Sequence, residues 1–240
     1  MSALRDAFQS LRRASSFGGT EQTPKHPHPT KVPTEPLQSS NFDIPPLEPI
    51  QLVGYAPQTK TRLMTESLAE EVRQLVPARL QLYPTWRLVY SLEQSGASLS
   101  TLYSKISDQT TTSGRRPGYV LLVRDSYGCI FGAYANEGFK PTDSRRFSGN
   151  GESFLWKTTV VDQDTNNVRF QAFPYTGLND FVMFCTKQFI SMGGGDGHYG
   201  LWIDSDLDKG VSQPSLTFGN ETLAHNAKFS IMALEVWRVG

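Results

Sequence analysis

The stretch Gly193–Gly210, GGGDGHYGLWIDSDLDKG, carries the residue types and spacings best suited to ligand chemistry in this chain. Gly195, Gly197 and Gly200 satisfy the pattern G-x-G-x-x-G, in which backbone N–H groups hold a dinucleotide pyrophosphate. That chemistry requires a helix directly after the glycines, because the helix N-terminus binds the phosphates. The residues that follow, Leu201–Asp204, are β-prone, and no amphipathic helix comes after them. The sequence therefore argues against a nucleotide site.

Three aspartates follow, and they alternate as calcium ligands often do: Asp204, Asp206 and Asp208. An EF-hand loop that starts at the first of them needs glycine at its sixth position and glutamate at its twelfth. This chain has Lys209 and Ser215 there. The pattern of the calcium-binding β-roll also lacks its aspartate. A weak, irregular cation site remains open, beside the alternative that these carboxylates cap turns or accept backbone hydrogen bonds.

The remaining explanation of this stretch is geometric. Glycine adopts positive φ and allows rings to approach the backbone closely. Three successive glycines between apolar strands predict a bulge or tight corner beneath a large ring, for which Trp202 and Tyr199 are available. Together with two glutamates considered next, the residues assigned a structural role are Gly193, Gly194, Gly195, Asp196, Gly197, Trp202, Asp204, Asp206, Glu152 and Glu235.

Other candidates for catalysis are few. Glu152 and Glu235 adjoin apolar strand residues, so either could be buried. A buried glutamate can be catalytic, but one that braces a corner by accepting hydrogen bonds is commoner. Of the four histidines only His198 lies near acids, and no G-x-S-x-G motif occurs. Cys129 and Cys185 lie in apolar strand patterns, where a thiolate is disfavoured. We expect no catalytic residue, no metal and no cofactor.

Composition excludes several function classes. The 240 residues include 23 basic and 23 acidic side chains, so no basic excess points to nucleic acid. No apolar run is long enough to span a membrane, and residues 1–13 lack the apolar core of a signal peptide. Two cysteines are too few for a disulfide framework. We expect an intracellular, soluble and monomeric protein.

The first fifty residues differ in kind from the rest. Residues 1–19 are predicted to form a mobile tail, in which Leu4, Phe8 and Leu11 make the apolar stripe of a short amphipathic helix. Such a helix would form only against a partner or a membrane surface, and an amphipathic mitochondrial presequence is an open alternative. Residues 20–50 are rich in proline and predict a disordered or polyproline-like linker.

From about residue 62 to residue 240 the pattern is globular. A capping box at Ser67–Glu70 opens a helix that Pro77 ends, and Ser98 caps a second helix. The face of the first helix carries Leu68, Val72, Leu75 and Val76. Strands are expected at 86–90, 119–123, 129–134, 152–157, 168–173, 181–185, 188–192, 200–203 and 228–237. Short strands with short turns predict an α+β fold that is mainly β, a two-sheet antiparallel β-sandwich with a few flanking helices.

Several motifs in a fixed order resemble those of the TLDc domain family. They are SLSTLY at 98–103, LVRD at 122–125, IFGAY at 130–134, GNGESFL at 149–155, FPYTGLN at 173–179, the stretch at 193–210, TFGN at 217–220 and LEVW at 234–237. No single motif is specific, but their order and density are, and the resemblance covers roughly three quarters of the chain. The compact form is similar to the fungal members of the family that act in oxidation resistance.

The resemblance implies a two-sheet antiparallel sandwich with flanking helices, in agreement with the pattern above. It also implies a role in protection against oxidative stress, without established catalytic residues or a cofactor. Several members bind the vacuolar-type proton-pumping ATPase (V-ATPase), and the fungal member is associated with release of its catalytic sector. The resulting hypothesis is a regulatory protein that docks on the peripheral stalk and catalytic sector of that pump and promotes their separation.

Candidate partner contacts are two basic segments. The first is the loop 138–146, with Lys140, Arg145 and Arg146, and the second is Arg238, Val239 and Gly240. We expect the protein in the cytoplasm and, through its partner, at the vacuolar membrane. Two alternatives stay open: a direct antioxidant or enzymatic role that uses Cys129 or Cys185, and a mitochondrial or membrane-targeting role of the tail.

Overall fold

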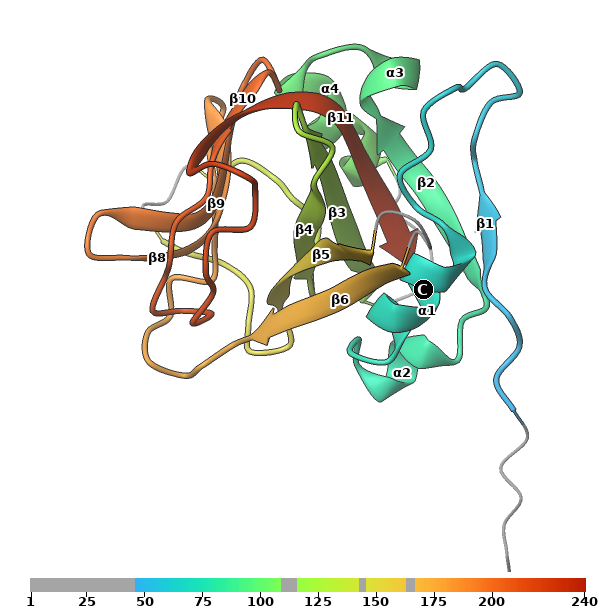
Figure 1. Ribbon diagram of the computed structural model, residues 1–240, viewed down its shortest axis with the longest axis horizontal. Helices are drawn as coiled ribbons and strands as arrows, with labels where there is room; N and C mark the ends of the chain where they lie inside the picture. Colours follow the sequence, from blue (N-terminus) through green and yellow to red (C-terminus); the bar gives the residue numbers. More distant parts are fainter. Residues whose placement is uncertain (1–45, 109–115, 143–145, 163–166) are drawn as a thin grey trace, which may run out of the picture. The chain divides into compact units, whose positions relative to one another are not determined.

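The computed structural model describes residues 46–108, 116–142, 146–162 and 167–240 (Figure 1). The predicted tail and most of the predicted linker lie outside these residues. Ile50, at the end of the predicted linker, is buried, and its N–H donates to Glu70 Oε1 at 3.0 Å. The linker prediction is therefore wrong at this position, because Ile50 already belongs to the packed domain.

Two β-sheets share one long strand. The large sheet has the order β6-β5-β4-β3-β11-β2-β1, and the small sheet has the order β7-β8-β9-β10-β11. The strands are β1 (Gln51–Val53), β2 (Thr85–Ser91), β3 (Gly118–Asp125), β4 (Ile130–Ala135), β5 (Phe154–Asp162), β6 (Asn167–Pro174), β7 (Met183–Cys185), β8 (Phe189–Gly195), β9 (His198–Asp204), β10 (Lys209–Val211) and β11 (Lys228–Val239). All pairs are antiparallel except β1 with β2.

The two sheets enclose the main core. One face of the large sheet, with Leu121 and Phe131, meets Ile190 and Leu201 of the small sheet in a single buried cluster. A second cluster lies on the other face of the large sheet, where Trp156 and Trp237 pack against α1 and α2. The mainly β sandwich with flanking helices is confirmed, and the strand that both sheets share refines it.

In the described residues four short helices flank the sheets: α1 (Glu66–Arg73), α2 (Ala78–Gln81), α3 (Leu92–Ser95) and α4 (Leu99–Ser107). Ser98 caps α4 as predicted, since its Oγ accepts the Thr101 N–H at 3.3 Å. The predicted start of α1 is wrong: Thr65 is its N-cap, and its Oγ1 accepts the Leu68 N–H at 3.2 Å. The helix also ends at Arg73, so Leu75 is 42% exposed instead of on the buried face.

Gly132, in the middle of β4, permits a close approach between strands. A Cβ at this position would lie 1.8 Å from the carbonyl oxygen of Leu121 on β3 and 2.9 Å from the ring of Trp156 on β5. Neither neighbour can withdraw, because the backbone oxygen and the indole are both fixed within the sheet and its core.

We expect Gly132→Ala to destabilise the domain by about 3 kcal/mol, at the upper end of the usual cost of overpacking, because the backbone oxygen that the new methyl group meets cannot move away. Urea unfolding measures the change. Gly197→Asn is the matched control, since Gly197 has φ +77° with no atom within 4 Å of its Cβ position and asparagine tolerates this backbone conformation. Equal midpoints for the native and Gly132→Ala proteins would contradict the close approach.

Candidate functional site

The glycine run lies inside strand β8 and not between strands. Gly193 has φ +73°, and a Cβ there would lie 2.6 Å from Ser215 Oγ and 2.8 Å from the ring of Phe218. Glycine is therefore required at this position on both conformational and steric grounds. The ring above the glycines is Phe218, so the prediction of Trp202 or Tyr199 in that place is wrong.

The tight corner follows the run. Gly195 pairs with His198, which leaves Asp196 and Gly197 as a two-residue hairpin loop with φ values of 52° and 77°. Positive φ at both central residues is the geometry that asparagine–glycine and aspartate–glycine pairs favour in hairpins. The Asp196–Gly197 dipeptide is thus the sequence signal for this hairpin, which the spacing of the glycines alone does not predict.

The aspartates after the hairpin brace a turn. Asp204 Oδ1 accepts the N–H groups of Asp208 and Lys209 at 3.0 and 3.2 Å, between β9 and β10. Asp206 is exposed on the same turn. Among the residues that the structure describes, no three histidine, cysteine, aspartate or glutamate side chains lie together in a way that could hold a metal ion.

The motifs around 179, 194 and 217 meet at one buried hydroxyl. Thr217 Oγ1 accepts the Gly194 N–H at 3.0 Å and lies 2.7 Å from Asn179 Oδ1, to which it donates. Thr217 is fully buried. Sequence segments that are far apart therefore share a structural purpose: they fix the loop 212–224 onto the glycine strand.

Glu235, in the centre of β11, is the most heavily hydrogen-bonded carboxylate in the described residues. Although 1% exposed, it accepts hydrogen bonds from four groups. The Tyr55 hydroxyl lies 2.9 and 2.8 Å from its two oxygens, and the N–H groups of Leu63 and Met64 donate at 2.9 and 3.2 Å. The Trp237 indole donates at 2.8 Å. Of the two roles considered for this glutamate, catalysis and bracing by accepting hydrogen bonds, these contacts are those of bracing.

Three of these donors belong to one segment, residues 55–65, which we call the strap. Burial, followed by the charge of Glu235, raises the pKa of Tyr55 well above its usual range, so the phenol keeps its proton and remains a donor. A T-shaped contact between the Tyr55 and Trp237 rings, with centroids 5.2 Å apart, closes the site. Glu235 therefore ties the strap to the large sheet.

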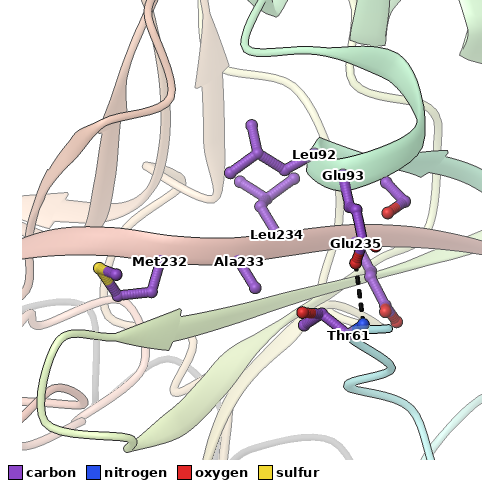
Figure 2. Close-up of a pocket in the computed structure, with 8 residues that line it drawn as sticks. Thr61, Leu92, Glu93, Met232, Ala233, Leu234 and Glu235 are labelled. Carbon is purple, nitrogen blue, oxygen red and sulfur yellow. Dashed lines mark hydrogen bonds between the residues drawn. The ribbon is translucent and has the colours of Figure 1, made fainter. Parts of the chain in front are cut away.

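A second carboxylate holds the same strap from α3. Glu93 accepts the N–H of Lys60 at 2.9 Å and that of Thr61 at 2.8 Å, the latter drawn beside Glu235 in Figure 2. These backbone hydrogen bonds lower the pKa of the Glu93 carboxyl. We call Glu235 with its hydrogen bonds to the strap the Glu235 clamp. A hollow of about 280 Å³ adjoins it, lined by Thr61, Leu92, Glu93, Met232 and Leu234 among others.

Residues 57–240 match the model of the TLDc domain family. The chain belongs to that family. It is 53% identical over 206 residues to oxidation resistance protein 1 of Kluyveromyces lactis, covering 81% of this chain and 82% of that protein. It is 48% identical to the protein of the same name from Eremothecium gossypii and 41% identical to that from Saccharomyces cerevisiae, with both chains covered completely in each comparison.

In this TLDc domain the two cysteines differ in exposure, but the pKa of each thiol is raised. Cys129 is half-buried beside a groove of about 670 Å³, and burial, followed by Asp125, raises the pKa of its thiol. Burial raises the pKa of Cys185 to about 12. Both thiols therefore favour the protonated form, which is the poorly nucleophilic one.

The predicted partner contacts of the TLDc domain differ in their exposure to solvent. Lys140 and Arg146 are exposed, while Arg145 lies outside the described residues. Val239 is fully buried in β11, where it pairs with Trp86 and Gly118. Arg238 and Gly240 are partly buried beside it. The expectation that this segment offers Val239 to a partner is wrong, because its side chain belongs to the second core cluster.

Glu152, unlike Glu235, is not buried. Its carboxylate is partly exposed and forms an ion pair with Arg79 at 2.9 Å, because Gly151 and Glu152 form a turn before β5 begins at Phe154.

No helix in the described part of the chain is long and apolar enough to cross a membrane.

We expect Glu235→Gln to destabilise the TLDc domain by about 2–3 kcal/mol, because an amide NH₂ faces donors that a carboxylate oxygen now satisfies. Urea unfolding followed by tryptophan fluorescence measures this loss. The control is Glu71→Gln, an exposed glutamate on α1, for which a change within about 0.5 kcal/mol is expected. Equal losses in the two variants would show that Glu235 does not clamp the strap.

Acidification should weaken the Glu93 contact. Because the pKa of Glu93 is lower in the folded protein than its ordinary value of 4.5, its contribution is complete above that value and disappears as the pH falls through the lowered pKa. The melting temperature of Glu93→Gln should lie below that of the native protein near about pH 7 and converge with it in acid. A difference that grows on acidification would reverse this assignment.

Proposed function

We propose that this chain is a non-catalytic binding protein that acts in resistance to oxidative stress. The names of the relatives support the role in oxidation resistance. The proposal that the protein is not a catalyst is supported by the state of its thiols and by the structural hydrogen bonds of its buried carboxylates. Both thiols favour the protonated form, and Asp125 accepts the N–H groups of Tyr127, Cys129 and His225.

The observation that carries this proposal is the saturation of Glu235. A general base or acid needs a free lone pair or proton directed at a substrate. Both oxygens of this buried carboxylate instead accept hydrogen bonds from the protein's own backbone and side chains. The buried carboxylate that most resembles a catalytic group is thus fully occupied by structure.

The partner that we propose is the vacuolar-type proton-pumping ATPase, in keeping with the resemblance described above. The domain binds the peripheral stalk and the catalytic sector and favours their separation. A ligand shifts such an equilibrium only if it binds one state more tightly, so the chain must prefer the detached sector to the intact pump. It acts from the cytoplasm and reaches the vacuolar membrane through this partner.

The test combines binding with assembly. Purified full-length chain should capture the detached catalytic sector in a pull-down and should lower the fraction of assembled pump when it is added to vacuolar membranes. The Cys129→Ser, Cys185→Ser double variant should do both as well as the native chain and should protect cells equally against peroxide. A native chain without effect on capture and assembly excludes the pump as partner, and loss of protection in a folded double variant supports thiol chemistry instead.

A further inference from the structure

Six aromatic side chains form an unbroken series of ring contacts on the small sheet, and we call them the aromatic strip. They are Phe147, Phe181, Phe184, Phe189, Tyr199 and Trp202. Neither core cluster includes any of them. All six keep part of their surface in solvent, up to 37% for Phe147 and 41% for Phe181. The strip is therefore a third apolar cluster, outside the sandwich interior.

The strip crosses three strands. Ring centroids are 5.3 Å apart for Phe147 and Phe184, 5.8 Å for Phe184 and Phe189, and 5.9 Å for Phe189 and Trp202. Phe184 on β7 pairs with Ser191 on β8, which pairs in turn with Trp202 on β9. Since alternate residues of these strands belong to the main core, Phe184 and Trp202 face the outer side of the small sheet.

The two outer faces of the sandwich differ in whether helices cover them. Helices α1 and α2 pack on the outer face of the large sheet through the second core cluster. In Figure 1 no helix of the described residues lies on the side of β8 and β9 that faces away from β3 and β4. Contiguous exposed apolar patches mark interaction sites, aromatic residues are enriched in them, and a helix is a regular solution for covering a sheet face.

Three cations of the described residues border the strip at its β7 end. Lys140 belongs to the loop that the Thr142 N–H fixes to the Cys185 carbonyl at 3.1 Å. Arg146 precedes Phe147, and Lys187 lies in the turn between β7 and β8. All three are exposed, and none takes part in an ion pair with another described residue. At the other end, Oδ1 of Asp204 accepts two backbone N–H groups, and Asp206 and Asp208 are exposed on the same turn.

We propose that the aromatic strip is the docking face for an acidic amphipathic helix of a partner protein. The apolar stripe of that helix covers the rings, as α1 covers the large sheet, and its carboxylates pair with Lys140, Arg146 and Lys187. Aromatic anchors supply affinity, while the cationic border supplies orientation and association rate. The inference deepens the proposed function, on which it rests for the existence of a protein partner.

The first experiment identifies the occupant in cells. The full-length chain carries a photoreactive benzoylphenylalanine in place of Phe184, and the control carries it in place of Val168, which is more than half exposed on β6. Irradiation and peptide mass spectrometry should yield, from position 184 alone, a segment with apolar residues at i, i+3, i+4 and i+7 and a net negative charge. A second copy of this chain, a lipid, a basic or non-helical segment, the same product from both positions, or no adduct would overturn the proposal.

The second experiment measures binding of the captured segment, made as a synthetic peptide. The variants are Phe147→Thr/Phe184→Thr and Lys140→Glu/Arg146→Glu/Lys187→Glu. Their matched controls are Val160→Thr/Val168→Thr and Arg87→Glu/Arg169→Glu, all at exposed positions on β2, β5 and β6 of the large sheet. Each strip variant should weaken binding by about tenfold or more, and each control by less than about twofold. Urea midpoints equal to that of the native chain show that the variants are folded, and native-like binding by folded strip variants would overturn the inference.

The two proposals fail separately. If the captured segment belongs to a protein other than the proton pump, the proposed partner is wrong and the docking face stands. If the catalytic sector binds the native chain and both folded strip variants equally well, the partner stands and the docking face is wrong.

Discussion

The fold depends on a buried negative charge to which no cation of the described residues donates a hydrogen bond. A carboxylate in a protein interior is costly unless hydrogen bonds replace its hydration, and four donor groups from β11 and the strap do so for Glu235. The two backbone N–H groups can meet that carboxylate only when Leu63 and Met64 are already seated on the sheet. Glu235 therefore specifies one path for the strap, and that path leads into Thr65 and the start of α1.

The glycine-rich stretch shows how a ligand-binding pattern can arise from packing alone. Its glycines lie where Phe218 and Phe181 approach the backbone of β8, and its first aspartate fills a hairpin turn. Removing side chains from β8 lets the loop around Thr217 lie directly on the strand. What looked like a cradle for phosphate is a surface onto which the protein packs its own aromatic rings.

Local patterns predicted the fold well, and long-range contacts explain the errors. The Ser98 cap, the hairpin of β3 and β4 and the long strand β11 each follow from residues a few positions apart. Thr65 replaced Ser67 as a helix cap because the strap delivers the chain to α1 from the Glu235 clamp. The three donors to Glu235 from the strap lie more than 170 residues away in sequence, so no local pattern could reveal them. The aromatic strip was missed for the same reason, since its members come from separate segments whose spacing carries no periodic signal.

The position of β11 has a consequence for the order of events during synthesis. This strand follows every other described strand in the sequence, yet it lies between β3 and β2 in one sheet and beside β10 in the other. Until it leaves the ribosome, the edges of β2, β3 and β10 that β11 pairs are open, and the strap has the Glu93 carboxylate to bind but not that of Glu235. Exposed strand edges invite association with other chains. In a nascent chain of this domain the two sheets therefore remain incomplete and unconnected until a single twelve-residue strand, β11, pairs with both of them.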